Sequence, residues 1–440
     1  MVSMVREGAI SPTELLEAHL RQIETRNPEL NAFVTVFADR SREEARALEQ
    51  SAAKGEPLGL LHGVPFTVKD SFDVAGFATE AGSRLRAGHR AAADAQVVAR
   101  MRREGAILLG KTNTPELLAS YETDNFVTGR TNHPLDASRT PGGSSGGEAA
   151  AIASFCSPGG IASDGGGSIR VPAHFCGIAG LKPTPGRIPG TGHFPSLGYP
   201  GGLMGVAGVM ARTAQDLRLL FSAVAGYDPQ DPFSSPVPLR QPVLHDLRIG
   251  VWERFYGVPV DEEIAGAVRD TAARLAGLGF VVEDFEPRGL ERAPNVWAVL
   301  FNHWPMLATR RLVEGRSEEL HWTLTESLGT KEPSAEEVLI QLAARDRMRA
   351  SLVRQMEEFQ VLLMPVCGIT AFHHRERHWE IGGKSIGVFQ AMIPAVLANV
   401  LGLPALTVPV ARSRSGLPIG IQLVGRPYDD ELLLELAMRV

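Results

Sequence analysis

Two segments rich in glycine and serine most constrain the fold of this chain. The first reads Thr140-Pro-Gly-Gly-Ser-Ser-Gly-Gly147, and the second reads Ser163-Asp-Gly-Gly-Gly-Ser-Ile-Arg170. Glycine at this density is unfavourable inside a helix or a strand, so both segments are predicted to be tight turns. A helix rich in small residues is predicted between them, over about 146–156, and it brings the two turns into one neighbourhood.

The second turn has the composition of an anion-binding loop. Its three glycines precede Ser168, so successive backbone N–H groups can converge on one point without interference from a Cβ atom. Such a loop suits an oxyanion hole, which stabilises the charge that develops during acyl transfer. Asp164 and Arg170 flank the turn, and we expect them to brace it as a charge-assisted pair.

A serine nucleophile needs a base, and no histidine has a suitable context. His174 follows Ser168 closely, and His133 and His193 lie in predicted loops. Lysine can serve where burial lowers its pKa, because desolvation disfavours the ammonium form. Lys69 ends the apolar run Val-Pro-Phe-Thr-Val-Lys, so it is the predicted site of a buried, partly neutral lysine.

Apolar runs bounded by glycine or charge predict strands along the whole chain. They lie at 64–69, 106–109, 247–252, 361–365, 405–409 and 418–424. Helical periodicity lies between them, beginning after the capping sequence Ser11-Pro-Thr-Glu14, which predicts an α/β fold with a largely parallel sheet. Apart from its one helix, 127–210 is predicted to be loops and turns.

Three local motifs have competing interpretations. Gly105-Ala-Ile-Leu-Leu-Gly-Lys-Thr112 matches a phosphate-binding loop, but its variable residues look like a core strand. Ser51-Ala-Ala-Lys54 matches one motif of penicillin-binding enzymes, and the accompanying motifs are missing from the sequence. Gly142-Gly-Ser-Ser-Gly146 matches a nucleophile elbow, but a proline-bounded loop leads into it rather than a strand. None of the three is the favoured interpretation.

The chain resembles the amidase signature family over nearly its whole length. The matching segments, in the expected order, are 63–70 (GVPFTVKD), 110–113, 142–147, 163–170, 180–187, 402–405 and 416–422. The resemblance implies a single domain over 1–440, an α/β/α sandwich with a large mixed, mostly parallel central sheet. We expect its catalytic core at about 60–225 and a mainly helical, substrate-side insertion at about 285–360.

The resemblance also implies the catalytic residues. Ser168 would be the nucleophile, Ser144 a bridging serine that follows a cis peptide bond, and Lys69 the base. The N–H groups of Gly165, Gly166, Gly167 and Ser168 would form the oxyanion hole, with Ser145, Asp164 and Arg170 in support. Gly165 stands where most family members carry a larger residue, which is expected to widen the acyl end of the pocket.

The sequence defines the substrate pocket less closely than it defines the catalytic residues. The loop 188–208 is either a lid over an apolar substrate or an ordinary surface loop, and its pocket candidates are Phe194, Leu197, Tyr199 and Met204. Helical spacing favours core packing over a pocket position for Trp297, Phe301, Trp304 and Met306. His374 and His378 could share a helix face, but the sequence offers no third ligand, so no metal site is predicted.

The expected function is hydrolysis of small aryl or acyl amides, and also of carbamates and esters, without a cofactor. The alternative is the catalytic subunit of a tRNA-dependent amidotransferase, in which glutamine is expected where Val171 stands. A net charge of −6 with scattered basic residues predicts no nucleic-acid partner. No apolar run reaches the roughly 20 residues of a membrane span, and no signal peptide is evident. We therefore expect a cytoplasmic monomer or homodimer.

Overall fold

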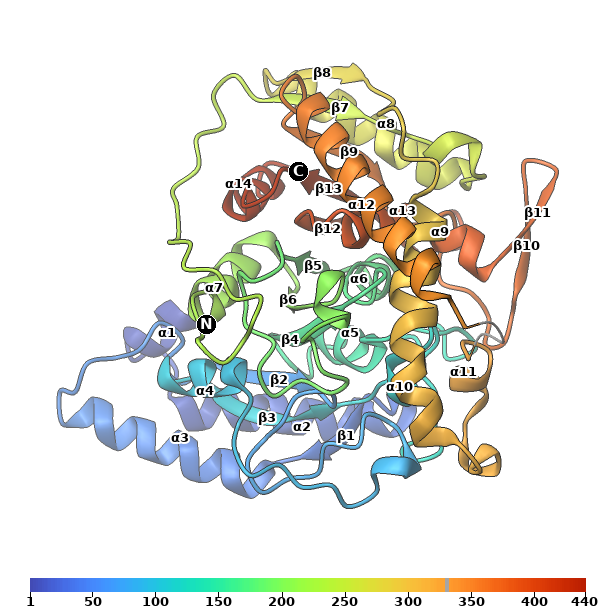
Figure 1. Cartoon of the computed structure of the whole chain (residues 1–440). Helices are drawn as coiled ribbons and strands as arrows, with labels where there is room; N and C mark the ends of the chain where they lie inside the picture. The colour runs from blue at the N-terminus through green and yellow to red at the C-terminus, as the bar shows by residue number, and fades with distance from the viewer. Residues whose placement is uncertain (329–331) are drawn as a thin grey trace.

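Strands from the whole length of the chain form one large sheet (Figure 1). The computed structural model describes residues 1–328 and 332–440, with the backbone alone for 304–308. The strand order in the described part is β1-β3-β2-β4-β6-β5-β12-β13-β9-β7-β8, and β10 and β11 form a separate hairpin. The strands are β1 (Phe33–Val36), β2 (Pro65–Lys69), β3 (Ile107–Thr112), β4 (Gly159–Asp164), β5 (Ala179–Lys182), β6 (Val206–Ala211), β7 (Arg248–Val251), β8 (Val281–Asp284), β9 (Val361–Pro365), β10 (His378–Ile381), β11 (Lys384–Gly387), β12 (Ala405–Arg412) and β13 (Pro418–Gly425).

Helices occur on both faces of this sheet. The α-helices are α1 (Val2–Arg6), α2 (Pro12–Leu30), α3 (Ala38–Ala53), α4 (Gln96–Arg103), α5 (Gly146–Ala153), α6 (Arg170–Cys176), α7 (Ala214–Val224), α8 (Glu262–Gly277), α9 (Ala293–Trp297), α10 (Trp304–Val313), α11 (Trp322–Thr325), α12 (Ala335–Gln355), α13 (Val388–Val400) and α14 (Asp430–Ala437). A π-helical segment, η5 (Ala298–His303), joins α9 to α10. None of the described helices is long and apolar enough to cross a membrane.

The two faces of the sheet bury different helices, as expected for an α/β/α sandwich. Apolar side chains of α4, α7, α8 and α14 pack on one face. On the other face, α2 and α5 cover the N-terminal strands, α6 covers the centre, and α9, α12 and α13 cover the C-terminal strands. The helical region after residue 290 therefore lies on the same face as α5 and α6, which follow the two glycine-rich turns.

The prediction of a mostly parallel sheet is wrong, although the sheet is mixed as expected. Antiparallel pairs are β1/β3, β4/β6, β5/β6, β5/β12, β12/β13 and β9/β13, whereas only β2/β3, β2/β4, β7/β8 and β7/β9 are parallel. A short turn joins β12 to β13, and such a hairpin requires antiparallel pairing. Strand periodicity does not carry this information, because it is the same in both directions.

The prediction that 127–210 lacks strands is also wrong. The central strands β4 and β5 lie in this segment, β6 begins in it and ends at Ala211, and every residue of each strand is buried. They are poor in the β-branched and aromatic residues by which strands are usually identified. Their small residues are a packing requirement, because a Cβ atom at Gly160 would lie 2.0 Å from Glu148 Oε1.

Several local predictions are confirmed. Ser11 Oγ accepts a hydrogen bond from the Glu14 amide at 3.1 Å, and Glu14 Oε2 accepts one from the Ser11 amide at 2.9 Å, which completes the capping box of α2. The variable residues of the apparent phosphate-binding loop lie in or beside buried strand β3, as their apolar character indicates. The strands predicted after residue 240 are β7, β9, β12 and β13.

Candidate active site

The last residue of β2, Lys69, is completely buried at the centre of the site. Its Nζ atom lies 2.7 Å from Ser144 Oγ and 3.1 Å from Ser163 Oγ. Burial lowers the pKa of Lys69 to about 7, although the Asp164 and Glu148 carboxylates act to raise it. A large fraction of this amine is therefore neutral near pH 7 and can accept a proton.

The first glycine-rich turn leads into α5 and presents both of its serines to the site. The Gly143–Ser144 peptide bond is cis, as the family resemblance implied. The Ser145 amide donates to the Ser168 carbonyl at 3.2 Å, and Ser145 Oγ donates to the Ser163 carbonyl at 3.3 Å. Ser145 thus ties the first turn to the second, and its supporting role stays a prediction.

Ser168 lies in the second turn, just before α6, and shares the wall of one cavity with Ser144. Among the described residues, no hydrogen bond joins the Oγ atoms of Ser144 and Ser168. The structure therefore brings Lys69 to Ser144 and places the two serine side chains beside the same cavity.

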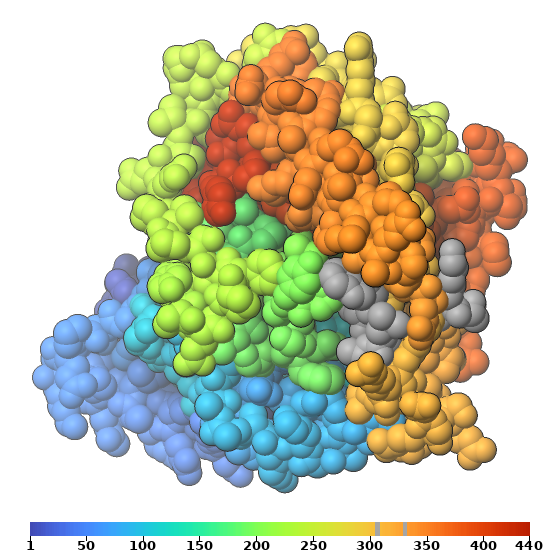
Figure 2. Space-filling view, in the orientation of Figure 1, coloured from blue at the N-terminus to red at the C-terminus, as the bar shows by residue number. Residues whose placement is uncertain are grey.

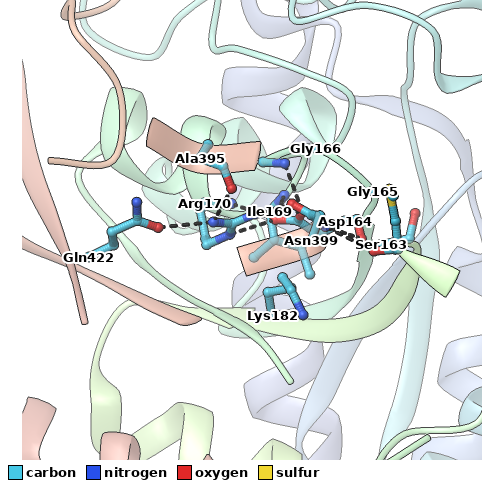
Figure 3. A network of polar contacts seen from close by, with 12 residues as sticks. Ser163, Asp164, Gly165, Gly166, Ile169, Arg170, Lys182, Ala395, Asn399 and Gln422 are labelled. Atoms are coloured by element: carbon cyan, nitrogen blue, oxygen red, sulfur yellow. Dashed lines mark hydrogen bonds and ion pairs between the residues drawn. The ribbon is translucent and has the colours of Figure 1, made fainter. Parts of the chain in front are cut away.

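The Asp164–Arg170 pair predicted to brace the second turn is present and fully buried (Figure 3). Arg170 donates through Nη2 to Asp164 Oδ1 and through Nε to Asp164 Oδ2, both at 3.0 Å. Further contacts of Arg170 reach Asn399 Oδ1, Gln422 Oε1 and the Ala395 carbonyl. Burial would raise the pKa of Asp164, but the Arg170 guanidinium holds it well below its usual range. The turn is consequently anchored to α13 and β13 by charge-assisted bonds.

The turn differs from the prediction at one of its four backbone donors. The Gly167 amide donates to Asp164 Oδ1 at 2.7 Å, so it is not free to bind an oxyanion. Among the described residues, the amides of Gly165, Gly166 and Ser168 have no acceptor. These three remain as candidate donors, and Gly167 instead holds the shape of the turn.

A cavity of about 1050 Å³ opens over the two serines. Phe194, Leu197 and Tyr199 line it as predicted, and all three belong to the segment 188–208. Figure 2 shows the part of this segment around residue 200, in green, at the surface between the blue N-terminal region and the orange α12. Met204 was wrongly predicted to line the pocket, since it is 1% exposed and packs in the core with α9 and α12. Whether the segment moves as a lid stays a prediction.

Aromatic side chains from the helical region form another wall of the cavity. Trp297 and Phe301 line it and also pack against the core around α9, α12 and α13, so core packing is confirmed for these two positions and the cavity contact adds to it. The side chains of Trp304 and Met306 lie outside the described residues. A Cβ atom at Gly165 would lie 2.0 Å from Phe301 Cζ, so the Phe301 ring takes up the space next to this glycine. The expectation of a wider acyl end is therefore wrong.

Among the described residues that line this cavity, no histidine is suited to act as the base and no cluster of metal ligands is present. His193 lines it, but burial lowers the pKa of this imidazole to about 3, and its Nδ1 already bonds to the Pro195 carbonyl. Among the described residues, no three His, Cys, Asp or Glu side chains cluster in a way that could hold a metal ion. His374 and His378 do not share a helix face, because His378 begins strand β10.

Three residues of the site were not predicted from the sequence. Ser163 binds Lys69 Nζ, and Tyr121 donates its hydroxyl hydrogen to the Gly166 carbonyl at 2.7 Å. Glu148 is buried in α5, where its carboxylate accepts hydrogen bonds from Thr67 and Thr112, and burial raises its pKa to about 7. Ser163 is the first residue of the second motif, so its position there was an available signal. Glu148 directly follows the first motif, and an ionisable residue in a helix of small, apolar residues was the signal for it. Tyr121 offered none.

Comparisons with known proteins agree on one family. The Amidase family profile matches residues 14–434. An indoleacetamide hydrolase from Bradyrhizobium diazoefficiens is 34% identical, with 99% of this chain and 84% of the relative covered. A glutamyl-tRNA(Gln) amidotransferase subunit from Moorella thermoacetica is 32% identical, with 99% and 93% covered. The crystal structure of a bacterial aryl acylamidase of the amidase signature enzymes superposes with a TM-score of 0.90 at 27% identity, with 100% and 94% covered.

Proposed function

Because this chain belongs to the amidase signature family of carbon–nitrogen hydrolases, we propose that it cleaves small aryl or acyl amides through an acyl-enzyme on Ser168. The observation that supports this most is the contact of buried Lys69 with Ser144 beside the cavity that Ser168 lines. Carbamates and esters of similar shape are further candidate substrates, since their carbonyl groups present the same target. The apolar and aromatic cavity wall favours substrates with an uncharged acyl group.

The proposed reaction is a proton relay in two directions. Neutral Lys69 accepts a proton from Ser144 Oγ, which takes the proton of Ser168 Oγ as that atom attacks the carbonyl carbon. The Ser144–Ser168 hydrogen bond that this step needs is expected to form when substrate is bound, because catalytic hydrogen bonds often tighten only then. In this proposal the amides of Gly165, Gly166 and Ser168 bind the negative oxygen. The relay returns the proton to the leaving nitrogen, and water then hydrolyses the acyl-serine.

Adduct mapping tests this proposal directly. Treatment with a fluorophosphonate should modify Ser168, with the adduct located by peptide mass spectrometry. The adduct should be missing in Ser168→Ala and should form far more slowly in Lys69→Met, because the base is lost. Modification of another residue, or none at all in folded protein, would contradict the assignment of the nucleophile.

The pKa of Lys69 predicts the pH dependence of the reaction. The pKa of this amine is lowered to about 7, so kcat/KM should fall as the pH drops below that value and Lys69 becomes protonated. Initial rates between about pH 5 and about pH 9 measure this. Glu148→Gln is the control, since Glu148 also has a pKa near 7. The pH profile of kcat/KM for this variant should still show an inflection, but at a lower pH than in the wild type. The reason is that the carboxylate that raises the Lys69 pKa is gone. A flat wild-type profile would argue against Lys69 as the base.

The second candidate function is that of an amidotransferase catalytic subunit. Glutamyl-tRNA(Gln) amidotransferase A subunits match at 31–34% identity over nearly the whole chain, which favours this function as much as the hydrolase relatives favour the first. The purified chain discriminates between the two. A stand-alone amidase turns over simple amides without partners, whereas a subunit of this kind should show little hydrolysis until its partner subunits are added.

A further inference from the structure

The three glycines of the second turn have no side chains to hold their peptide groups. Glycine backbone is freer to rotate than that of any other residue, so the directions of these N–H groups must be held from outside the turn. A peptide group is planar, and in the trans form its C=O and N–H point in opposite directions. A hydrogen bond to a carbonyl oxygen therefore also sets the direction of the following amide.

Trp297 provides such a bond to the first peptide group of the turn. Its indole Nε1 donates to the Gly165 carbonyl at 2.9 Å, although the two residues are far apart in the sequence. This bond sets the direction of the Gly166 N–H, which is one of the proposed oxyanion donors. Trp297 ends α9, so the contact connects the helical region after residue 290 to the turn before α6.

Tyr121 provides a corresponding bond to the second peptide group. Its hydroxyl donates to the Gly166 carbonyl at 2.7 Å, and the opposite end of this group, the Gly167 N–H, donates to Asp164 Oδ1 at 2.7 Å. Burial raises the pKa of Tyr121, so its hydroxyl keeps the proton that it donates. The second peptide group is thus held at both ends, whereas the first is held only at its carbonyl.

The packing around the indole leaves it little freedom to turn. Trp297 stacks on Phe301 and on Phe389, with ring centroids 5.5 Å and 5.4 Å away. A Cβ atom at Gly166 would lie 2.7 Å from Trp297 Cζ2, so the close approach of the indole requires glycine at this position. The orientation of the Nε1–H group is consequently fixed by contacts on several sides.

We propose that Trp297 is a positioning residue that directs the Gly166 amide toward the oxyanion, and that Tyr121 is a positioning residue that holds the adjoining Gly166–Gly167 peptide group. This inference rests on the proposed function of Ser168. Removing an oxyanion donor typically lowers kcat by about 10²–10³-fold, and a small misplacement of one can approach that effect. Because the first peptide group is held only by Trp297, loss of the indole N–H should matter more than loss of the Tyr121 hydroxyl.

The test compares Trp297→Phe, Tyr121→Phe and the matched control Trp252→Phe. Trp252 is a buried core residue whose indole N–H has no partner in the described structure, so its replacement removes an N–H that holds nothing. For Trp297→Phe we expect kcat to fall by about 10–100-fold with KM within about threefold of wild type. For Tyr121→Phe we expect a smaller fall, of about 3–10-fold, and for Trp252→Phe a wild-type kcat.

A tetrahedral inhibitor separates positioning from a general loss of structure. A boronic acid bound to Ser168 should lose affinity in Trp297→Phe by about the same factor as kcat/KM, because both depend on the oxyanion donors. Folded Trp297→Phe with kcat within about threefold of wild type overturns the inference, and if that variant does not fold, Tyr121→Phe decides on the same criterion. Wild-type protein that neither hydrolyses amides nor is labelled at Ser168 overturns the proposed function instead, and the inference with it.

Discussion

Replacing Lys69 by methionine is expected to lower kcat by about 10⁴-fold or more while the protein remains folded. Members of a catalytic triad act as a unit, so loss of the base removes most of the chemical acceleration that the nucleophile provides. Methionine has a similar length, and it leaves Ser144 and Ser163 without the amine that they contact. Steady-state kinetics with an activated ester and with an amide measure the effect, and the loss should be greater for the amide because its leaving group needs a proton.

The same substitution should leave stability unchanged or raise it, and the sign follows from the pKa. The folded-state pKa of Lys69 is about 7, against an ordinary value of 10.5. Between these values the unfolded chain binds a proton that the folded protein does not, so the penalty for burying Lys69 grows as the pH falls from 10.5 to about 7. Lys69→Met removes this penalty, and urea denaturation at about pH 7.5 should show no loss of stability.

Lys111 is the matched control for this prediction. It is also a buried lysine, but its Nζ atom forms an ion pair with Asp70 at 2.7 Å. Lys111→Met leaves that carboxylate buried and unpaired, which should destabilise the protein by about 3–5 kcal/mol.

The kinetic prediction has its own refuting outcome. A Lys69→Met variant that keeps more than about a hundredth of wild-type kcat would exclude Lys69 as the base.

Replacing Asp164 by asparagine is expected to destabilise the protein by about 3–5 kcal/mol and also to lower kcat. The substitution leaves the Arg170 guanidinium fully buried without its counter-charge. It also weakens the bonds that Asp164 accepts from the Gly167 and Ile169 amides, which shape the turn around Ser168. Urea denaturation and steady-state kinetics measure the two effects.

The contribution of Asp164 should depend on pH in the same sense as that of Lys69, with stability falling as the pH falls, but in a far more acidic range. Its folded-state pKa lies below the ordinary value of 3.8, so its stabilisation is present above that value and is lost as the pH falls through the folded pKa. Asp136→Asn is the control, because Asp136 pairs with Arg139 near the surface and should contribute less than about 1 kcal/mol. Equal losses in the two variants, or wild-type stability in Asp164→Asn, would contradict the importance of the buried pair.

Predictions from the sequence succeeded where neighbouring residues interact with one another. The capping box of α2 involves residues within one helical turn, and the Asp164–Arg170 pair closes one short loop. The assignment of Lys69, Ser144 and Ser168 came from ordered motifs, and the structure brings Lys69 to Ser144 and places both serines at one cavity. Their catalytic roles stay proposals until the adduct is mapped.

Predictions failed where a residue's surroundings come from distant parts of the chain. The small residues of β4 resemble a loop until Glu148 packs against Gly160, and Gly165 suggests open space until Phe301 fills it. One failure was local: the Gly167 amide is lost as an oxyanion donor because the carboxylate of Asp164, within the same turn, accepts its hydrogen bond.

The sequence by itself determined the helices with caps and periodicity, the apolar strands, the family and the candidate catalytic residues. The helices and strands follow from local hydrogen bonding and periodicity, whereas the family and the candidate catalytic residues follow from the ordered motifs of the family resemblance. Only the tertiary structure decided the directions of the strands, the aromatic wall of the cavity and the bonds from Trp297 and Tyr121 to the glycine turn. The physical reason is that packing and hydrogen bonding between remote segments depend on where the folded backbone brings them, and no local pattern records that position.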